Sequence, residues 1–269
     1  MQFEHITYET DGKIVRIGLN RPKAVNAIHD PMKSELLQAF QALSREKKAM
    51  VAILFGHGGN FSSGVDLRSQ EWEHSPEGWR GHFDALINIG RTMWNLDIPV
   101  IAAVQGYCLG GGTDLAVMAD FVLADETARF GEPEIMMGSF APTLIIPWLA
   151  PMKKAREFLV MGVELNAEEA KNMGLVNRVY PAEQFDAEVE KWAAHICNTP
   201  RHALYTSKRV INKQYEIMGF WEAIDYNREM NVNMKLHTSK EEREENLRFL
   251  REGGLKAKLK DSADKRLVR

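Results

Sequence analysis

The chain has 269 residues, of which 45% are hydrophobic and 26% are charged, as in an ordinary folded globular protein. Its formal net charge of -3 gives no bulk attraction to nucleic acid or to an acidic membrane surface, so we expect neither as a partner. No apolar run approaches the about 20 residues of a membrane span, and the first residues lack the pattern of a signal peptide, so a cytoplasmic protein is expected.

The first elements in chain order are a hairpin, a helix and a strand. Alternating apolar residues at 3–9 and 13–20 flank Asp11-Gly12, a dipeptide typical of hairpin turns. Residues 31–47 carry apolar side chains at helical spacing, which predicts a helix. Residues 49–56, AMVAILFG, are almost all apolar, as in a strand whose two faces are both covered.

The middle of the chain continues this alternation. A helix is expected to end near residue 95, and residues 98–104 predict a second buried strand with a proline near its start. A short helix at 113–119 and a strand at 120–126 follow, and the chain to about residue 250 is predicted to be mainly helical. The alternation of strands and helices predicts an α/β fold with sequential crossovers. We expect an α/β core over residues 1–200 and a helical region over 201–269 that packs apart or against a partner.

Two glycine-rich turns directly follow apolar strands: GHGGNFSSG at 56–64 and GYCLGGG at 106–112. Glycines at the carboxyl ends of such strands let the backbone approach a ligand and leave N–H groups facing it. The second turn opens a helix, whose unpaired first N–H groups favour an anion or a developing oxyanion. The alternative interpretation is a tight packing turn with Asp114 as a first-turn charge. Neither the P-loop nor the GxGxxG fingerprint is present.

Four segments, taken in this order, resemble the enoyl-CoA hydratase/isomerase (crotonase) superfamily. They are NRPKAVNAI at 20–28, FSSGVDL at 61–67, the long segment from AAVQ to IMMG at 102–138, and LNAEEAKNMGLVNRVYP at 165–181. The resemblance covers residues 3–250. It implies a crotonase-like α/β core of coiled ββα units and a helical C-terminal region that trimerises. A homotrimer, or a homohexamer made of two trimers, is therefore expected.

The resemblance also implies a substrate and a site. Members of the superfamily bind acyl thioesters of coenzyme A, and two backbone N–H groups form an oxyanion hole, which match Val65 and Gly111 here. The two acid/base positions match Asp114 and Glu134. Coenzyme A enters as part of the substrate, so we expect no other cofactor and, without metal-ligand spacing among the cysteines and histidines, no metal. The neighbouring positions expected to contact the acyl-CoA are Lys23, Ala24, Val25, Ser63, Gly64, Asp66, Leu67, Arg68, Gly110, Pro133 and Met137.

The leading interpretation is hydration of a 2-enoyl-CoA to a 3-hydroxyacyl-CoA, with two carboxylates around one water. Two departures from the family pattern leave other reactions open. Hydratases usually carry glutamate at the position of Asp114, and dienoyl-CoA isomerases, which carry aspartate there, have a further acid where this chain has Pro142. Residues 139–149 also replace a loop that is rich in proline and glycine in many relatives.

The alternatives are a double-bond isomerase that uses Glu134 alone, a hydrolase or C–C lyase, and a non-catalytic member that binds acyl-CoA or RNA. Glu132 is expected to face solvent or an interface. The helical stripe of Trp221, Tyr226 and Met230 is expected to serve the core or a trimer contact.

Overall fold

The computed structural model describes residues 2–66, 74–141, 143–239, 241–242, 244–245 and 248. Its larger sheet begins with the expected antiparallel hairpin, in which Gly12 has a φ of 60° that glycine adopts without strain. The remaining strands are parallel, and the strand order is β1-β2-β3-β4-β6-β9. The strands are β1 (Ile6–Asp11), β2 (Ile14–Leu19), β3 (Val51–Gly56), β4 (Val100–Val104), β6 (Phe121–Asp125) and β9 (Arg178–Tyr180).

The strands of a smaller sheet alternate along the chain with the last strands of the larger one, and their order is β5-β7-β8. These strands are β5 (Tyr107–Leu109), β7 (Arg129–Gly131) and β8 (Leu165–Asn166), with β5 parallel and β8 antiparallel to β7. Because β5 comes three residues after β4, the small sheet holds the second glycine-rich turn close to the carboxyl ends of the parallel strands.

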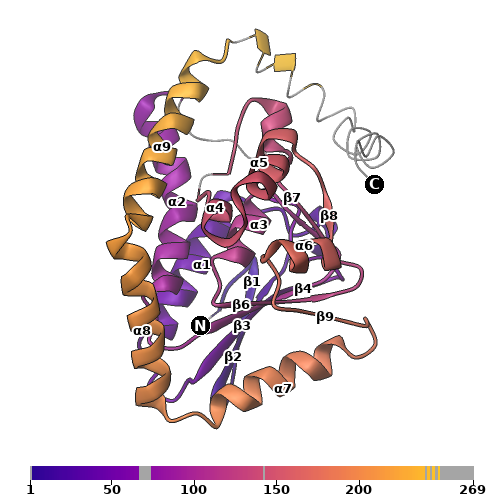
Figure 1. Ribbon diagram of the computed structural model, residues 1–269, viewed down its shortest axis with the longest axis vertical. Helices are drawn as coiled ribbons and strands as arrows, with labels where there is room; N and C mark the ends of the chain where they lie inside the picture. Colours follow the sequence, from indigo (N-terminus) through magenta and orange to yellow (C-terminus); the bar gives the residue numbers. More distant parts are fainter. Residues whose placement is uncertain are drawn as a thin grey trace.

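Helices cover both faces of the larger sheet (Figure 1). On one face α7 packs on Val51, Ile53 and Ile101, whereas their neighbours in sequence belong to the cluster on the other face with α1 and α2. This alternation explains why β3 and β4 are apolar throughout, since successive strand residues point to opposite faces. The helices are η1 (Pro22–Ala24), α1 (Asp30–Leu43), α2 (Pro76–Trp94), α3 (Gly111–Val117), η2 (Pro133–Met137), α4 (Ile146–Leu149), α5 (Met152–Met161), α6 (Ala167–Met173), α7 (Phe185–Cys197), α8 (Arg201–Ile217) and α9 (Phe220–His237).

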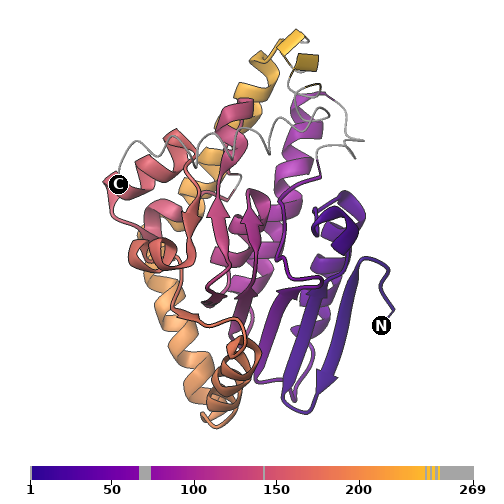
Figure 2. The same cartoon turned by 90° about the vertical axis from the view of Figure 1, so that its right-hand side faces the viewer.

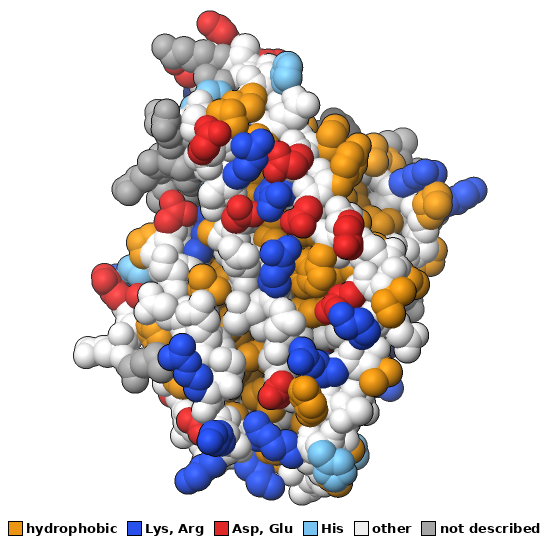
Figure 3. Space-filling model, turned by 90° about the vertical axis from the view of Figure 1, so that its left-hand side faces the viewer, with side chains coloured by type: hydrophobic (Ala, Val, Ile, Leu, Met, Phe, Trp, Pro, Cys, Tyr) orange, Lys and Arg blue, Asp and Glu red, His pale blue; other side chains and the backbone are white. Residues whose placement is uncertain are grey.

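Of the last two long helices, α9 runs along α2, and α8 meets the C-terminal end of α2, where Asn212 donates to the Trp94 carbonyl at 2.9 Å, so neither lies apart from the core (Figures 1 and 2). Acidic and basic side chains intermix on this face (Figure 3), and Arg80 of α2 pairs with Glu229 of α9 at 2.9 Å. Such exposed pairs contribute little stability, so the apolar anchors Phe220 and Ile224, which join the main core cluster, hold α9 in place. The predicted boundary between an α/β core and a helical region at residue 200 stays a prediction, and α8 begins at Arg201.

The predicted α/β class is confirmed, and the hairpin and both central strands lie where they were expected. One predicted boundary is wrong: the helix expected over 31–47 ends at Leu43. Beyond Leu43 the amides of Arg45 and Glu46 donate to carbonyls three residues back, so the α-helical ladder ends there, and the Arg201 guanidinium donates to the carbonyl oxygens of Lys47 at 2.8 Å and Ala49 at 2.6 Å. Within the described ranges, no helix combines the length and the apolar character needed to cross a bilayer.

Candidate active site

The two glycine-rich turns lie side by side. Ser62 of the first turn forms an isolated parallel bridge with Cys108 of the second. In this bridge the Ser62 N–H donates to the Tyr107 carbonyl at 2.8 Å, and the Leu109 N–H donates to the Ser62 carbonyl at 2.9 Å. The bridge holds the backbone that follows Ser62 against the backbone that follows Leu109, which is where the oxyanion-hole amides were expected.

The Val65 and Gly111 amides are close neighbours. A methyl group added at Gly111 would lie 3.6 Å from the Val65 nitrogen, and one added at Gly64 would lie 3.4 Å from the Gly111 nitrogen. The bridge between Ile28 and Val65 uses the carbonyl of Gly64 and the amide of Asp66. The Val65 N–H is therefore left without an acceptor among the described residues.

Glu134 lies directly against the second turn. A Cβ on Gly110, whose φ is 52°, would meet the Glu134 Oε1 atom at 1.8 Å, so only glycine fits there. Burial raises the pKa of Glu134, whereas its own backbone N–H, the Glu132 carboxyl, the Gly111 N–H and the charge of Lys235 oppose this rise. The Gly111 amide thus faces an acidic side chain at the position expected for a catalytic acid or base.

Asp114 lies in α3 and is 1% exposed. The Thr143 hydroxyl donates to its Oδ1 atom, and the Thr143 N–H donates to Oδ2 at 3.4 Å. Burial raises the pKa of Asp114 to about 7, with Glu134 adding to the rise and the hydrogen bonds from Thr143 and Leu144 opposing it. The unusual loop at 139–149 therefore supplies the direct partner of this acid.

The expectation for Glu132 is wrong, because its side chain is 2% exposed and does not face solvent. It directly follows β7, and side chains two residues apart in an extended chain share a face. Phe130 is fully buried, so Glu132 points inward with it. The signal was present in the sequence as an acid two residues after a core aromatic. Burial raises the pKa of Glu132 well above its ordinary value, with Glu134 and Asp114 adding to the rise.

Lys235 of α9 was not expected at the site. Its ammonium group donates to the Gly138 carbonyl at 3.3 Å and lies 5.5 Å from the centre of the Trp79 ring. Burial lowers its pKa to about 8, and the charge of Glu134 opposes this shift. A cation from the C-terminal helices therefore partly offsets the acidic charge of the cluster.

The positions expected to contact the coenzyme A portion cluster around η1. The Ser63 N–H donates to the Val25 carbonyl at 2.9 Å, which places η1 next to the first glycine-rich turn. Lys23 is exposed, whereas Asp66 is 7% exposed and pairs with Arg21 at 3.1 Å. Pro133 is buried at the start of η2, and Met137 ends that helix. Leu67 and Arg68 lie outside the described residues.

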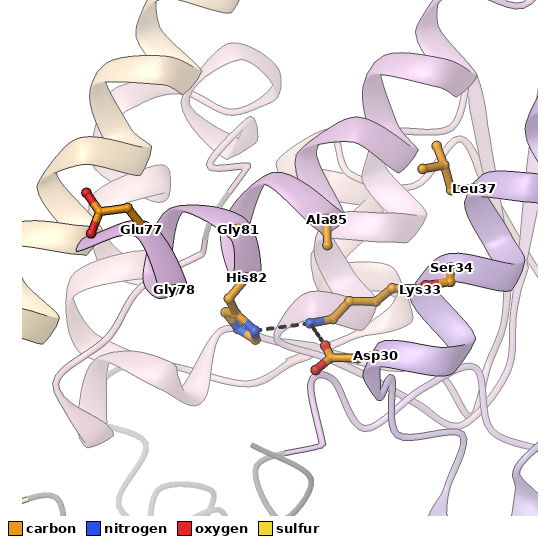
Figure 4. Close-up of a pocket in the computed structure, with 9 residues that line it drawn as sticks. All are labelled: Asp30, Lys33, Ser34, Leu37, Glu77, Gly78, Gly81, His82 and Ala85. Atoms are coloured by element: carbon orange, nitrogen blue, oxygen red, sulfur yellow. Dashed lines mark hydrogen bonds and ion pairs between the residues drawn. The ribbon is translucent and has the colours of Figure 1, made fainter. Parts of the chain in front are cut away.

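Two surface cavities lie away from these residues. One, of about 300 Å³, opens between α1 and α2, where the Lys33 ammonium bonds to Asp30 at 2.8 Å and to His82 at 3.1 Å (Figure 4). The other, of about 620 Å³, lies between Trp94 and the α8 residues around Arg209. Neither cavity is lined by an expected site residue, so the candidate site consists of the paired amides and the acids beside them.

Replacing Asp114 with asparagine is expected to change how stability depends on pH. The pKa of Asp114 is raised in the folded protein, so folding favours the neutral form of this side chain. The protonated side chain contributes its full stability below about pH 4. This contribution is lost as the pH rises through about 7. Asparagine does not ionise. The stability of D114N relative to the wild type should therefore grow between about pH 4 and 7, by up to on the order of 4 kcal/mol. Urea unfolding at several pH values measures this. The exposed Asp97→Asn variant is the control, and an equal pH trend in both variants would contradict the burial argument.

Comparisons with known proteins identify the family of this chain. The enoyl-CoA hydratase/isomerase family matches residues 9–254. The chain is 33% identical over 232 residues to a probable mitochondrial enoyl-CoA hydratase of Dictyostelium discoideum, covering 85% of this chain and 82% of that protein. It is 34% identical over 218 residues to a crotonyl-CoA hydratase of Syntrophomonas wolfei, covering 79% of this chain and 83% of that protein.

A solved structure extends the similarity to the fold. The crystal structure of an enoyl-CoA hydratase/isomerase from Xanthobacter autotrophicus Py2 superposes with a TM-score of 0.89 at 30% identity, covering 97% of this chain and 98% of that chain. The order of strands, the two sheets and the C-terminal helices are thus those of a known fold. The chain belongs to the enoyl-CoA hydratase/isomerase (crotonase) superfamily and has the crotonase α/β fold.

Proposed function

We propose that the protein adds water to a 2-enoyl-CoA to give a 3-hydroxyacyl-CoA. The observation that carries this proposal is the pair of neighbouring amides, Val65 and Gly111, beside the buried carboxyls of Glu134 and Asp114. Two amides that converge on one thioester oxygen stabilise the negative charge that develops there as the enolate forms. Relatives named as enoyl-CoA and crotonyl-CoA hydratases support the same reaction class.

In the proposed reaction the thioester oxygen accepts hydrogen bonds from both amides and polarises the conjugated double bond. Glu134 takes a proton from water as the water oxygen bonds to C3, and the double-bond electrons move onto the thioester as an enolate. One proton is then returned to C2, so the enzyme ends with the protons it began with. Asp114 helps to hold the water, and its pKa of about 7 lets it accept or donate a hydrogen bond at neutral pH.

A specific contact supports a second candidate, double-bond isomerisation. Both carboxylate oxygens of Asp114 accept hydrogen bonds from Thr143, which ties this acid to the 139–149 loop. Glu134 would then work alone, taking a proton from C2 of a 3-enoyl-CoA and returning it to C4. Asp114 would only shape the pocket in that reaction.

Two substrates separate these candidates. A hydratase removes the ultraviolet band of the conjugated enoyl thioester when it is given crotonyl-CoA, whereas an isomerase creates that band from a 3-enoyl-CoA. We expect the first result. Its absence with 2-enoyl-CoAs of every chain length tested would refute the hydratase, and inactivity on both substrate types would leave a hydrolase, a C–C lyase or a non-catalytic member that binds acyl-CoA or RNA.

We further propose a homotrimer or homohexamer in the cytoplasm. Support for assembly comes from apolar side chains exposed on α8 and after it, among them Val210 at 53%, Ile217 at 78% and Met218 at 60%. Tyr226 of the expected stripe is 69% exposed, whereas Trp221 is half-buried. Exposed apolar patches are typical of association surfaces. Light scattering of the full chain tests the assembly, and a monomer at every concentration would refute it.

A further inference from the structure

The proposed reaction uses two carboxyls, but the site holds a third. Glu132 and Asp114 are buried, Glu134 is half-buried with its Oε2 atom shielded from solvent, and both of the other acids raise the cost of ionising Glu132. Like charges in a buried site cannot all be ionised at neutral pH, so at least one of these acids keeps its proton. Among the described residues, these side chains do not form a group arranged to hold a metal ion, which leaves proton binding to explain them.

Glu132 is the acid with the fewest partners. Neither of its oxygens receives a hydrogen bond from an N–H or O–H group of the described residues, although both are shielded from solvent. The titratable groups around it are acids or a thiol: Asp114 of α3, Glu134 of η2 and Cys108 of β5. Burying an ionised carboxylate without a donor is far more costly than burying a neutral acid, so Glu132 keeps its proton.

Glu134 shares this shortage of donors at one oxygen: its Oε2 atom is also shielded from solvent and receives no hydrogen bond from the described residues. The Gly111 N–H, its own backbone N–H and the charge of Lys235 nevertheless lower the pKa of Glu134 against the effect of burial. A proton held between the two carboxyls would supply the donor that these buried oxygens lack. A hydrogen bond between two carboxyls requires a proton on one of them. The donors around Glu134 favour its ionised form, so the shared proton belongs to Glu132.

We propose that Glu132 is a positioning residue: a neutral acid that donates a hydrogen bond to Glu134 and keeps that carboxylate ionised and oriented beside the Gly111 amide. The effect of Glu132 on turnover rests on the proposed function, whereas the protonation of Glu132 does not. A charge-assisted hydrogen bond of this kind is short and directional, so it restricts Glu134 to the orientation in which it reaches the substrate.

The protonation is tested on the full chain without substrate, by infrared spectroscopy at pH 7. The wild type minus E132Q difference spectrum should contain the C=O band of a protonated carboxyl, and so should wild type minus E132L. The exposed Glu126→Gln variant serves as the control and should not remove that band. If the protonated band has the same intensity in the wild type, E132Q and E132L, Glu132 is ionised and the proposal is wrong. This result is independent of any activity, so a failed hydratase assay would not affect it.

The positioning role is tested by the pH at which Glu134 gains its proton, followed as the carboxylate band that E134Q removes. Leucine supplies no donor, so E132L should move this titration upward by about 1–2 pH units, the equivalent of one hydrogen bond to a charged group. Glutamine supplies an amide donor, so the Glu134 titration of E132Q should lie close to that of the wild type. The acid limb of turnover should move in parallel.

Other groups titrate nearby and must be separated from this shift. Asp114, with a pKa of about 7, and Lys235, with a pKa of about 8, act on Glu134 from α3 and α9 and are present in every variant. Their contribution therefore cancels in the comparison of E132L with E132Q. An unshifted Glu134 titration in E132L overturns the positioning role, as does an equal shift in both variants, and if E132L does not fold, the infrared result of E132Q decides alone.

Discussion

Replacing Glu134 with glutamine is expected to lower the turnover of a 2-enoyl-CoA by about 10²- to 10⁴-fold, the usual contribution of a positioned general acid or base. Glutamine keeps the size of the side chain but does not accept a proton from water. Burial raises the pKa of Glu134, so the ionised carboxylate already opposes folding and its neutral replacement should not lower stability. Steady-state kinetics and urea unfolding of the same preparation measure both effects.

The exposed Glu126→Gln variant is the matched control for this experiment. It makes the same chemical change on the loop after β6, where the side chain is exposed and remote from the paired amides. Its turnover should equal that of the wild type. If E134Q retained full turnover, Glu134 would not be the acid or base, and both the hydratase and the isomerase proposals would lose their central residue.

Replacing Gly110 with alanine is expected to be as damaging as E134Q, for a geometric reason. The added methyl carbon would lie 1.8 Å from the Glu134 Oε1 atom and 2.6 Å from Cδ, so the carboxyl must move away from the Gly111 amide. The φ of 52° adds backbone strain on the order of 1–3 kcal/mol. We expect a loss of turnover of about 10²-fold or more, together with reduced stability. Kinetics and thermal unfolding measure the two effects.

Gly138, which follows η2, provides a control for a positive φ, although its ψ is 47° and that of Gly110 is -128°. Its φ is 60°, which is close to that of Gly110, but an added methyl group would meet nothing within 4 Å. Gly138→Ala should therefore cost about 1–2 kcal/mol of stability from the left-handed conformation and leave turnover close to the wild type. If both alanine variants lost the same activity, backbone strain rather than displacement of Glu134 would be the cause.

Much of the fold was predictable because its signals are local. The DG turn between two alternating segments identified the hairpin, and the short apolar runs identified β3 and β4. The end of α1 was not predictable in the same way. The amides of Arg45 and Glu46 turn to carbonyls three residues back, and the segment that follows is bonded to Arg201, about 150 residues further along the chain; helical periodicity contains no information on such a contact.

The site was partly predictable for the same reason. Glycine-rich turns after apolar strands, together with the family resemblance, placed the two amides and Glu134 close to one another, which their geometry now supports. Contacts that depend on the packing of distant segments were missed. Thr143 reaches Asp114 from the 139–149 loop, and Lys235 approaches Glu134 from α9. Glu132 was misplaced because a charged residue was expected to be exposed, although its alternation with Phe130 pointed inward.

The central claim is that the amides of Val65 and Gly111 bind one thioester oxygen, and a crystal structure of the protein with a bound 2-enoyl-CoA tests it most directly. The predicted result is a carbonyl oxygen about 2.7–3.1 Å from both amide nitrogens, with the Glu134 carboxylate next to the reacting carbons. A thioester oxygen bound by neither amide, or by one amide while the other faces away, would contradict the proposed chemistry.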